Sequence, residues 1–317
     1  MTAFNMRAAN KLAEEERIPV DWLILAIVAS ILWALGTIID KVILTKHMQD
    51  PVSYQLLYVA TELPVLLVLL VFTNVSSALP WVALGIAAGL SHYLGLFLYF
   101  KAMMIEEASR VISLFYIGPI FTLILAATVL KENLTSSMYI GVILLVLGAV
   151  SISYKKVEGK GTMISPALGL LLLCSFTLSV YEILTKYVLG SLDLTSFFFW
   201  EFMGFVIAAT VTFTHPKIRQ GFLTTVKGVK RPVLFWRVVN TYMSITALIL
   251  YFVAMSIGLA SLVSGATSFE PFFVLLFAVL LSFFVPHVLK EDIGRRALVV
   301  KALAVILIVA GAWLIAG

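Results

Sequence analysis

The sequence predicts an all-α membrane protein whose ten transmembrane helices form two inverted five-helix repeats. Composition is the first reason. The chain has 317 residues, of which 62% are hydrophobic and 12% are charged, whereas a soluble domain carries about 25% charged residues. The mean hydropathy is +1.07. A chain with so few charged residues is expected to lie in the lipid of a membrane and not in water. The net charge of +5 lies mostly in short gaps between apolar runs, where basic residues meet lipid headgroups and not nucleic acid.

The second reason is the length of the apolar runs. A helix needs about 20 residues to cross a hydrocarbon core about 30 Å thick, whereas a membrane strand needs only about 9–11 residues. The polar, mixed-charge first 20 residues do not have the usual form of a signal peptide, so the first run is expected to remain as a span. The ten predicted spans cover residues 21–44, 52–73, 80–103, 109–130, 135–154, 165–187, 194–214, 233–257, 260–287 and 297–316.

The third reason is an internal repeat. Residues 99–109 and 251–261 are identical at seven of eleven positions, and the same offset of 152 aligns Pro119 with Pro271. The chain therefore divides into repeats at 1–158 and 159–317. Because each repeat has five helices, an odd number, the second enters the membrane from the opposite side. Inverted repeats are common in secondary transporters, whose substrate sites lie near the midplane between the repeats.

Several stretches carry a family likeness: Trp33 to Gly36, Ala108 to Phe121 with Leu130 to Thr135, Ala260 to Phe273 with Lys290 and Glu291, and the helix-end lysines Lys41 and Lys186. Together they resemble the EamA domain of the drug/metabolite transporter superfamily. The resemblance covers almost the whole chain and implies ten helices and a transport function. The chain departs from the family pattern in two ways. The proline-to-glutamate spacing is 13 residues in the first half and 20 in the second, and the second helix has Tyr58 and Glu62 where an arginine is often found.

Four ionisable residues are predicted deep within the spans: Glu62, His92, Glu201 and Glu270. A charge near the bilayer centre costs at least about 2.5–3.5 kcal/mol, so such residues usually face the bundle or a wet cavity. They are candidates for substrate binding or coupling. The alternative for each is a hydrogen bond inside the bundle without a transport role.

Glu270 is the strongest of these candidates. It directly precedes Pro271, and the equivalent position in the first repeat is Gly118. A structural need shared by both halves would not require this asymmetry. The alternative is a neutral glutamate bonded to a neighbouring helix.

Pro119 and Pro271 remove a backbone donor at matching places, which predicts a gate or a helix kink; a packing kink is the simpler alternative. Arg237 and Lys301 are candidate charge partners, close enough to helix ends to snorkel to the membrane surface. Other expectations are structural. Gly85 and Gly89 allow close helix contact, Tyr99 and Tyr251 anchor at the interface, Glu182 pairs with Lys186 on a helix surface, and Cys174 is a small buried residue.

These features predict a secondary transporter of a small polar organic metabolite, driven by protons or by exchange, with alternating access at the midplane. The deep acids outnumber the deep bases, which favours a cationic or zwitterionic substrate or proton coupling. The sequence has no nucleotide-binding motif, motif of a soluble enzyme, or metal-ligand spacing, so no ATP drive, cofactor or metal is expected. The alternatives are a non-transporting scaffold or lipid-handling protein and, less favoured, a membrane-embedded enzyme.

Charge also predicts the orientation in the cell membrane. The connections after the odd-numbered spans hold 14 basic residues, and the opposite side holds 5. The positive-inside rule therefore places both termini outside. Ten-helix proteins of the family that the chain resembles usually have both termini in the cytoplasm, so the two arguments conflict; the charge count is preferred because it belongs to this sequence.

Overall fold

The computed structural model describes residues 21–72, 78–131, 135–157, 161–258, 260–284 and 294–316. The predicted N-terminal tail, the boundary at 158/159 and Lys290–Glu291 lie outside these residues. The elements are α2 (Asp21–Lys46), α3 (Pro51–Phe72), α4 (Leu79–Ile105), α5 (Ala108–Phe115), α6 (Gly118–Leu125), the π-helical turn η1 (Ala126–Leu130), α7 (Ser136–Ser153), β1 (Tyr154–Val157), β2 (Gly161–Ile164), α8 (Leu168–Leu189), α9 (Leu194–Thr214), α10 (Pro216–Gly228), α11 (Arg231–Ile257), α12 (Ala260–Thr267), α13 (Glu270–Phe284) and α14 (Arg295–Ala316).

The described residues include nine helices long and apolar enough to cross a membrane. Two of these spans combine shorter segments, α5 with α6 and η1, and α12 with α13. Within the predicted span 135–154, the described apolar part of α7 is shorter, Ser136–Gly148. Many apolar side chains on these helices are exposed, including Leu67, Val71 and Ile306, as expected of surfaces that face lipid. The chain is a multi-pass membrane protein, and its ten spans remain a prediction.

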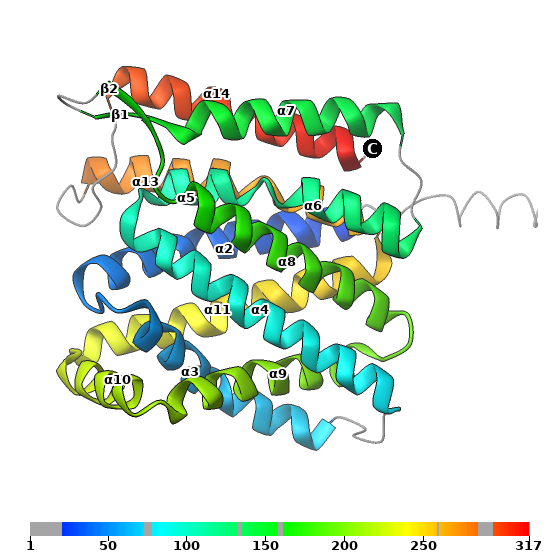
Figure 1. The fold of residues 1–317 in the computed structure, drawn as a ribbon, viewed down its shortest axis with the longest axis vertical. Coiled ribbons are helices and arrows are strands. Elements are labelled where there is room, and N and C mark those ends of the chain that lie inside the picture. Colours follow the sequence, from blue (N-terminus) through cyan, green and yellow to red (C-terminus); the bar gives the residue numbers. More distant parts are fainter. Residues whose placement is uncertain are drawn as a thin grey trace, which may run out of the picture.

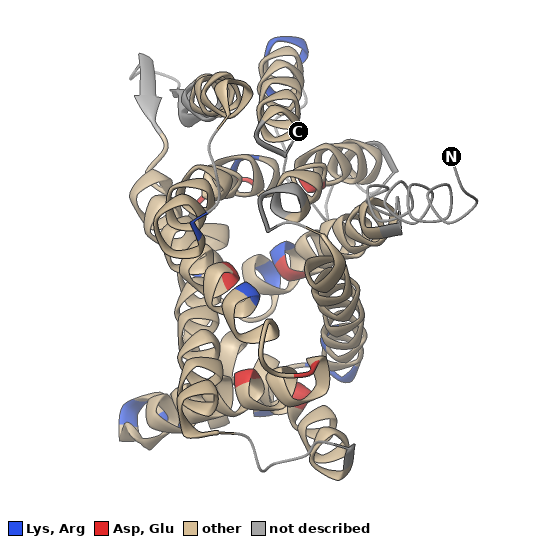
Figure 2. Ribbon diagram, turned by 90° about the vertical axis from the view of Figure 1, so that its right-hand side faces the viewer, with Lys and Arg blue, Asp and Glu red and all other residues tan. Residues whose placement is uncertain are grey.

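The helices lie side by side in a stack (Figure 1). Helices α7 and α14 pack against each other at one end of the stack, α4 packs along α8 and α9 in its middle, and α2 packs along α11. Helices α3, α9 and α10 lie at the other end. Figure 2, which looks along the helices, shows acidic and basic positions on the central helices as well as at the periphery.

Equivalent lysines close the ends of two helices. Lys41 of α2 donates to the carbonyls of Met103 (2.5 Å) and Glu106 at the end of α4. Lys186 of α8 donates to the carbonyls of Met255 (2.9 Å) and Gly258 (2.8 Å) at the end of α11. These carbonyls have no partner within their helix, and a cation there also complements the helix dipole. The same interaction therefore occurs once in each half.

Equivalent aspartates begin two other helices. Asp50 accepts from the backbone N–H of Ser53 (3.1 Å) at the start of α3, and Asp193 accepts from that of Ser196 (3.0 Å) at the start of α9. Each carboxylate also accepts from the hydroxyl of the same serine. Hydrogen bonds from Ser196 and Thr195 lower the pKa of Asp193 to about 2, so this cap is charged at neutral pH.

Glycines allow close backbone approach between helices. A Cβ atom on Gly89 of α4 would lie 1.9 Å from the Glu201 carbonyl oxygen of α9, and one on Gly85 would lie 2.9 Å from the Trp200 Cβ. Gly204 of α9 in turn faces the backbone of Ile86. The predicted close contact at Gly85 and Gly89 is therefore present.

The structure differs from the sequence prediction in three ways. Two predicted continuous helices, 109–130 and 260–287, are each interrupted, between α5 and α6 and between α12 and α13. A short antiparallel hairpin, β1–β2, follows α7 where the prediction had only helices and loops. Helix α10 occupies the predicted connection 215–232, where Ile218, Phe222 and Val226 recur at helical spacing.

Candidate functional site

A cavity of about 170 Å³ lies among the central helices and is lined by both halves of the chain. An engineered apolar cavity of about 150 Å³ accommodates benzene, so this one is large enough for a small organic molecule. The lining includes three carboxylates, five tyrosines, one histidine and one tryptophan, and no Lys or Arg from the described part of the chain. The polar and aromatic side chains of the lining include those of Trp33, Thr37, Asp40, Tyr58, His92, Tyr99, Tyr116, Tyr181, Glu182, Tyr251 and Glu270.

Glu270 stands at the first residue of α13, beside the interruption that separates α12 from α13. Its two carboxylate oxygens accept from different elements: Oε1 from Thr37 of α2 (3.1 Å) and Oε2 from Tyr116 (2.9 Å). Thr37 also bonds the Tyr99 hydroxyl at 2.9 Å. Hydroxyl partners can rotate to donate or accept, so this carboxyl group can be accommodated with or without a proton.

Serines from neighbouring helices brace both helix interruptions. Ser175 of α8 donates to the carbonyl of Phe115 (2.8 Å), and Ser30 of α2 donates to the carbonyl of Thr267 (3.4 Å). Ser179 also donates to the Gly118 carbonyl (3.0 Å). Pro119 and Pro271 occupy the second positions of α6 and α13, where their missing N–H groups are unpaired in any helix. Each proline thus lies directly after an interruption and not within a continuous helix.

Asp40 is held by a buried positive charge at the edge of the cavity. Arg237 of α11 donates to its Oδ1 at 2.7 Å, and Asn240 donates to the same oxygen at 2.5 Å. The Tyr54 hydroxyl donates to that oxygen as well. The Arg237 guanidinium also lies over the rings of Tyr54 and Tyr58, 5.0 Å and 4.7 Å from their centroids. Asp40 is therefore compensated by a partner inside the bundle.

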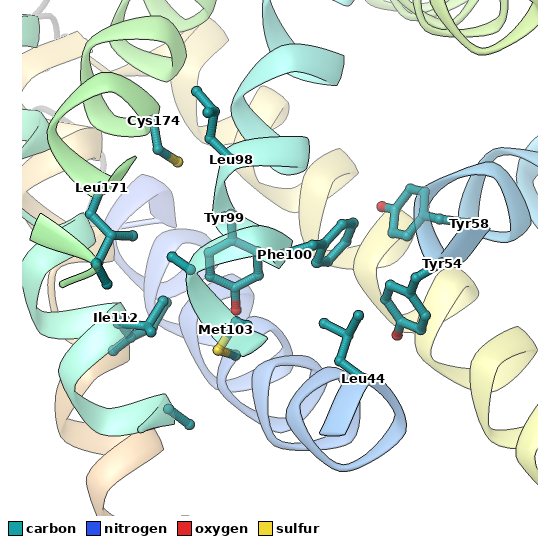
Figure 3. Packing of buried hydrophobic residues seen from close by; sticks show 14 of the residues in the cluster. Leu44, Tyr54, Tyr58, Leu98, Tyr99, Phe100, Met103, Ile112, Leu171 and Cys174 are labelled. Atoms are coloured by element: carbon teal, nitrogen blue, oxygen red, sulfur yellow. The ribbon is translucent and has the colours of Figure 1, made fainter. Parts of the chain in front are cut away.

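Aromatic rings pack beside this ion pair. Tyr54 and Tyr58 project from α3 toward Phe100 of α4, while Tyr99 projects from α4 toward Ile112 (Figure 3). The Tyr54 and Phe100 rings pack edge to face with centroids 5.0 Å apart. Tyr58, Tyr99 and Phe100 line the cavity together with Asp40, so they present aromatic surface to a ligand.

Glu182 of α8 is the third carboxylate of the lining and accepts from Thr122 at 2.6 Å. Two further buried tyrosines, Tyr181 and Tyr251, also line the cavity. The Tyr251 hydroxyl lies near the Glu182 carboxylate. Their hydroxyls can donate to or accept from a polar ligand in the cavity.

His92 and Glu201 form a pair between α4 and α9. The His92 Nδ1 atom lies 2.7 Å from Glu201 Oε1, and the imidazole stacks on the Tyr181 ring with centroids 4.5 Å apart. Glu201 is buried and does not line the cavity, whereas His92 does. Glu62 is also outside the lining, where it hydrogen-bonds with Tyr58. Of the four predicted deep residues, His92 and Glu270 reach the cavity directly.

The cavity is built from equivalent positions in the two halves that carry different chemistry. At the offset of 152, His92 corresponds to Ser244, Tyr99 to Tyr251 and Gly118 to Glu270, and all six residues line the cavity. At the offset of 145 that aligns Lys41 with Lys186, Thr37 corresponds to Glu182, and both line it as well. The tyrosines are shared, while the ionisable groups are unique to one half.

Several sequence interpretations are corrected by burial. Arg237 and Lys301 were expected to snorkel, but they are only 0% and 1% exposed. Lys301 binds Glu107 at 2.8 Å, so it is not a partner of the deep acids. Tyr99 and Tyr251 are buried cavity residues and not interface anchors. Lys186 binds the carbonyls at the end of α11, so it is more than a surface partner of Glu182. Cys174 is buried, as expected.

Four residues of the site were not predicted from the sequence: Asp40, Asn240, Tyr116 and Glu182. Asp40 is an acid six residues before the end of α2, but the predicted span ended early and placed it near the membrane surface. No group of three metal-ligating side chains occurs within the described ranges.

Comparisons with known proteins agree with the fold. Residues 21–154 match the EamA-like transporter family. No curated protein matches the chain. A solved structure titled "Crystal structure of protein" has a TM-score of 0.62, covers 92% of this chain and 94% of its own, and is 17% identical; this likeness concerns the fold alone. Residues 21–154 thus form a domain of the EamA-like transporter family, as the sequence resemblance predicted.

Proposed function

We propose that the protein is a secondary transporter of a small organic cation, or of a zwitterion held through its cationic group. The observation that carries the proposal is the acidic cavity between the halves, where Glu270 and Glu182 lie among tyrosines and none of the described lysines or arginines lines the wall. A carboxylate attracts an ammonium group, and aromatic faces add about 0.5–2 kcal/mol of cation–π attraction.

Glu270 supplies a simple coupling step. One carboxylate cannot hold a proton and pair with an ammonium group at the same time, so binding of the substrate releases the proton and protonation releases the substrate. Both Glu270 partners are hydroxyls, which suits either state. Proton exchange against a cation follows from this competition.

Alternating access would come from the two halves, 1–158 and 159–317, acting as an inverted pair. Support for this division comes from the equivalent lysine and aspartate helix caps and from the equivalent serines at the two interruptions. The interruptions before Pro119 and Pro271 flank the cavity, where hinge or gate movements would open it in turn to each side.

The alternatives fit the cavity less well. A scaffold would have no need for carboxylates and tyrosine hydroxyls grouped around a cavity. A membrane-embedded enzyme would need clustered catalytic groups open to lipid. In the described site, His92 is engaged by Glu201 and lies in the wall of the cavity among the central helices.

Thermal unfolding of the purified protein tests the substrate class. A panel of small ammonium compounds, zwitterions and carboxylates is screened at neutral pH. A ligand at 100 times its Kd stabilises the folded state by about 2.7 kcal/mol. We expect ammonium compounds or zwitterions to raise the Tm of the wild type and of Asp193→Asn, an exposed acid-to-amide control, but not of Glu270→Gln. Stabilisation by carboxylates alone would contradict the proposal.

Transport in proteoliposomes tests the coupling. A ligand from the screen should accumulate against an imposed pH gradient with the wild type and with Asp193→Asn. Glu270→Gln keeps the size of the side chain but cannot titrate, so its residual transport should lose the pH dependence. Wild-type rate and pH dependence in the Gln variant would remove the coupling role from Glu270.

A further inference from the structure

We propose that α10 and the start of α11 form a surface that binds anionic phospholipid headgroups. We call this surface the α10 patch and define it by five cations: Lys217, Arg219, Lys227, Lys230 and Arg231. It lies where the chain leaves α9 and enters α11, two membrane-spanning helices, and so at the boundary of the membrane (Figure 1).

The helix α10 rests on the bundle by one apolar edge. Ile218, Phe222, Val226 and Val229 recur at helical spacing and are half-buried against the hydrophobic core. No residue of α10 is fully buried. The helix therefore lies along the surface of the bundle with its remaining faces free.

The cations of the α10 patch are exposed at the protein surface. None of the five forms an ion pair with another described residue. The chain contains no Asp or Glu between Glu201 and Glu270, so no acidic residue in this stretch of 68 residues can neutralise them. Neither α10 nor α11 therefore supplies a counter-charge.

Exposed apolar side chains lie beside the cations. Leu223, Phe235 and Trp236 are 46%, 62% and 53% exposed. Aromatic rings at the ends of spans favour the headgroup level of a bilayer, and a helix with one apolar and one basic face favours an anionic membrane surface. A phospholipid offers both the negative phosphate and the acyl chain that this mixture of side chains fits.

The fold alone does not require this surface. The connection at the corresponding place in the first half, residues 73–78 between α3 and α4, is short and has no charged residue. The α10 patch is thus an addition to one half. If its cations served only to orient the chain during insertion, the folded protein would not distinguish anionic from neutral lipid.

The test uses the purified full chain in neutral detergent, titrated with fluorescent phosphatidylglycerol or fluorescent phosphatidylcholine. Each cation near an anionic surface contributes roughly a fivefold gain in affinity. We expect the triple variant Lys217→Gln, Arg219→Gln, Lys227→Gln to raise the Kd for phosphatidylglycerol at least about tenfold and to leave that for phosphatidylcholine unchanged. Added salt should weaken only the phosphatidylglycerol binding of the wild type.

A matched control removes three other exposed cations from the same predicted side of the membrane: Lys46→Gln, Arg295→Gln, Arg296→Gln. The proposal is overturned if the control loses as much affinity as the α10 variant, or if the α10 variant binds phosphatidylglycerol like the wild type. An unchanged Tm in phosphatidylcholine shows that the variants are folded, and Lys227→Gln alone, with an intermediate Kd expected, replaces the triple variant if that one unfolds.

A second readout places the lipid at the α10 patch. In nanodiscs, brominated phosphatidylglycerol should quench tryptophan fluorescence more than brominated phosphatidylcholine at the same mole fraction. The difference should shrink in Trp236→Phe, because this ring adjoins the patch. Equal quenching by both lipids in the wild type would place the anionic lipid elsewhere and overturn the proposal.

Discussion

At the residue scale, the buried charges of this protein are held by specific partners. Arg237 lies between Asp40, Tyr54 and Thr241, and Lys301 binds Glu107. A buried ion costs several kcal/mol to desolvate, so its partner and hydrogen bonds must compensate it. Glu270, by contrast, accepts from two hydroxyls, those of Thr37 and Tyr116, among the described residues. This difference separates structural charges from the carboxylate that is free to take a proton or a substrate.

The Asp40–Arg237 pair gives a prediction about stability. Arg237→Gln leaves Asp40 without its positive partner and should cost about 3–5 kcal/mol. The double variant Asp40→Asn, Arg237→Gln should be more stable than Arg237→Gln, because no uncompensated charge remains. Thermal unfolding in detergent measures both, with the exposed Lys101→Gln as a control near the wild type. A double variant less stable than the single would show that the pair does not act as a unit.

At the element scale, helix ends and helix contacts position the cavity. The helix interruptions at Tyr116–Ile117 and Ser268–Phe269 bring Tyr116 and Glu270 to the lining. Close packing of α4 on α9 brings His92 to Glu201. Neither follows from the apolar composition of these helices. Both depend on a few glycines, serines and prolines at defined places.

Gly89 tests the contact between α4 and α9. In Gly89→Ala the new Cβ would lie 1.9 Å from the Glu201 carbonyl, so the helices must separate, at a cost of about 1–3 kcal/mol or more. Gly221→Ala is the control, since its Cβ meets nothing within 4 Å and alanine favours a helix by about 0.8–1 kcal/mol. The Tm should fall for the first variant and hold or rise for the second; an unchanged Tm for Gly89→Ala would contradict the contact.

The lysine caps give a second prediction at this scale. Lys186→Met keeps the aliphatic stem but leaves the Met255 and Gly258 carbonyls without their charged donor. A hydrogen bond to a charged group contributes about 1.5–3 kcal/mol, so the variant should be destabilised by at least that amount. Lys46→Met, exposed in the last turn of α2, should unfold like the wild type. Equal Tm values for the two variants would show that the cap contributes nothing.

At the scale of the whole molecule, the two halves share a framework and divide the chemistry. Equivalent caps, serines and tyrosines recur in both halves. In contrast, His92, Glu182 and Glu270 each correspond to an uncharged residue at the equivalent position of the other half. An inverted arrangement of such halves would place one cavity between them and give it an asymmetric lining. A single substrate orientation would then be favoured in both access states.

Orientation is tested on the same scale. The charge count places α10 in the cytoplasm and both termini outside. Cys174 is buried, so Cys174→Ser with the exposed Thr224→Cys gives one reactive thiol on α10. An impermeant maleimide should label it in inside-out vesicles and not in intact cells, and a C-terminal reporter active only in the cytoplasm should be silent. Labelling in intact cells would reverse the orientation.

The sequence by itself determined the class of protein, the family resemblance and most helices, because these depend on local composition and on repeated residues. Ten apolar runs, the offset of 152 and the acids Glu62, Glu201 and Glu270 are all visible in it. The helix α10 left a periodic signal at Ile218, Phe222 and Val226 that could have been found.

Only the tertiary structure decided which polar residues lie together in the cavity. Asp40, Tyr116 and Glu182 lie far apart in the chain and reach one cavity because α2, α8 and the interruption before α6 converge there. The structure also shows that Arg237 and Lys301 are buried inside the bundle. Their distance from a helix end in the sequence could not show this. Partners such as Thr37 with Glu270, 233 residues apart, arise from packing, since apolar runs fix that helices form but not which faces meet.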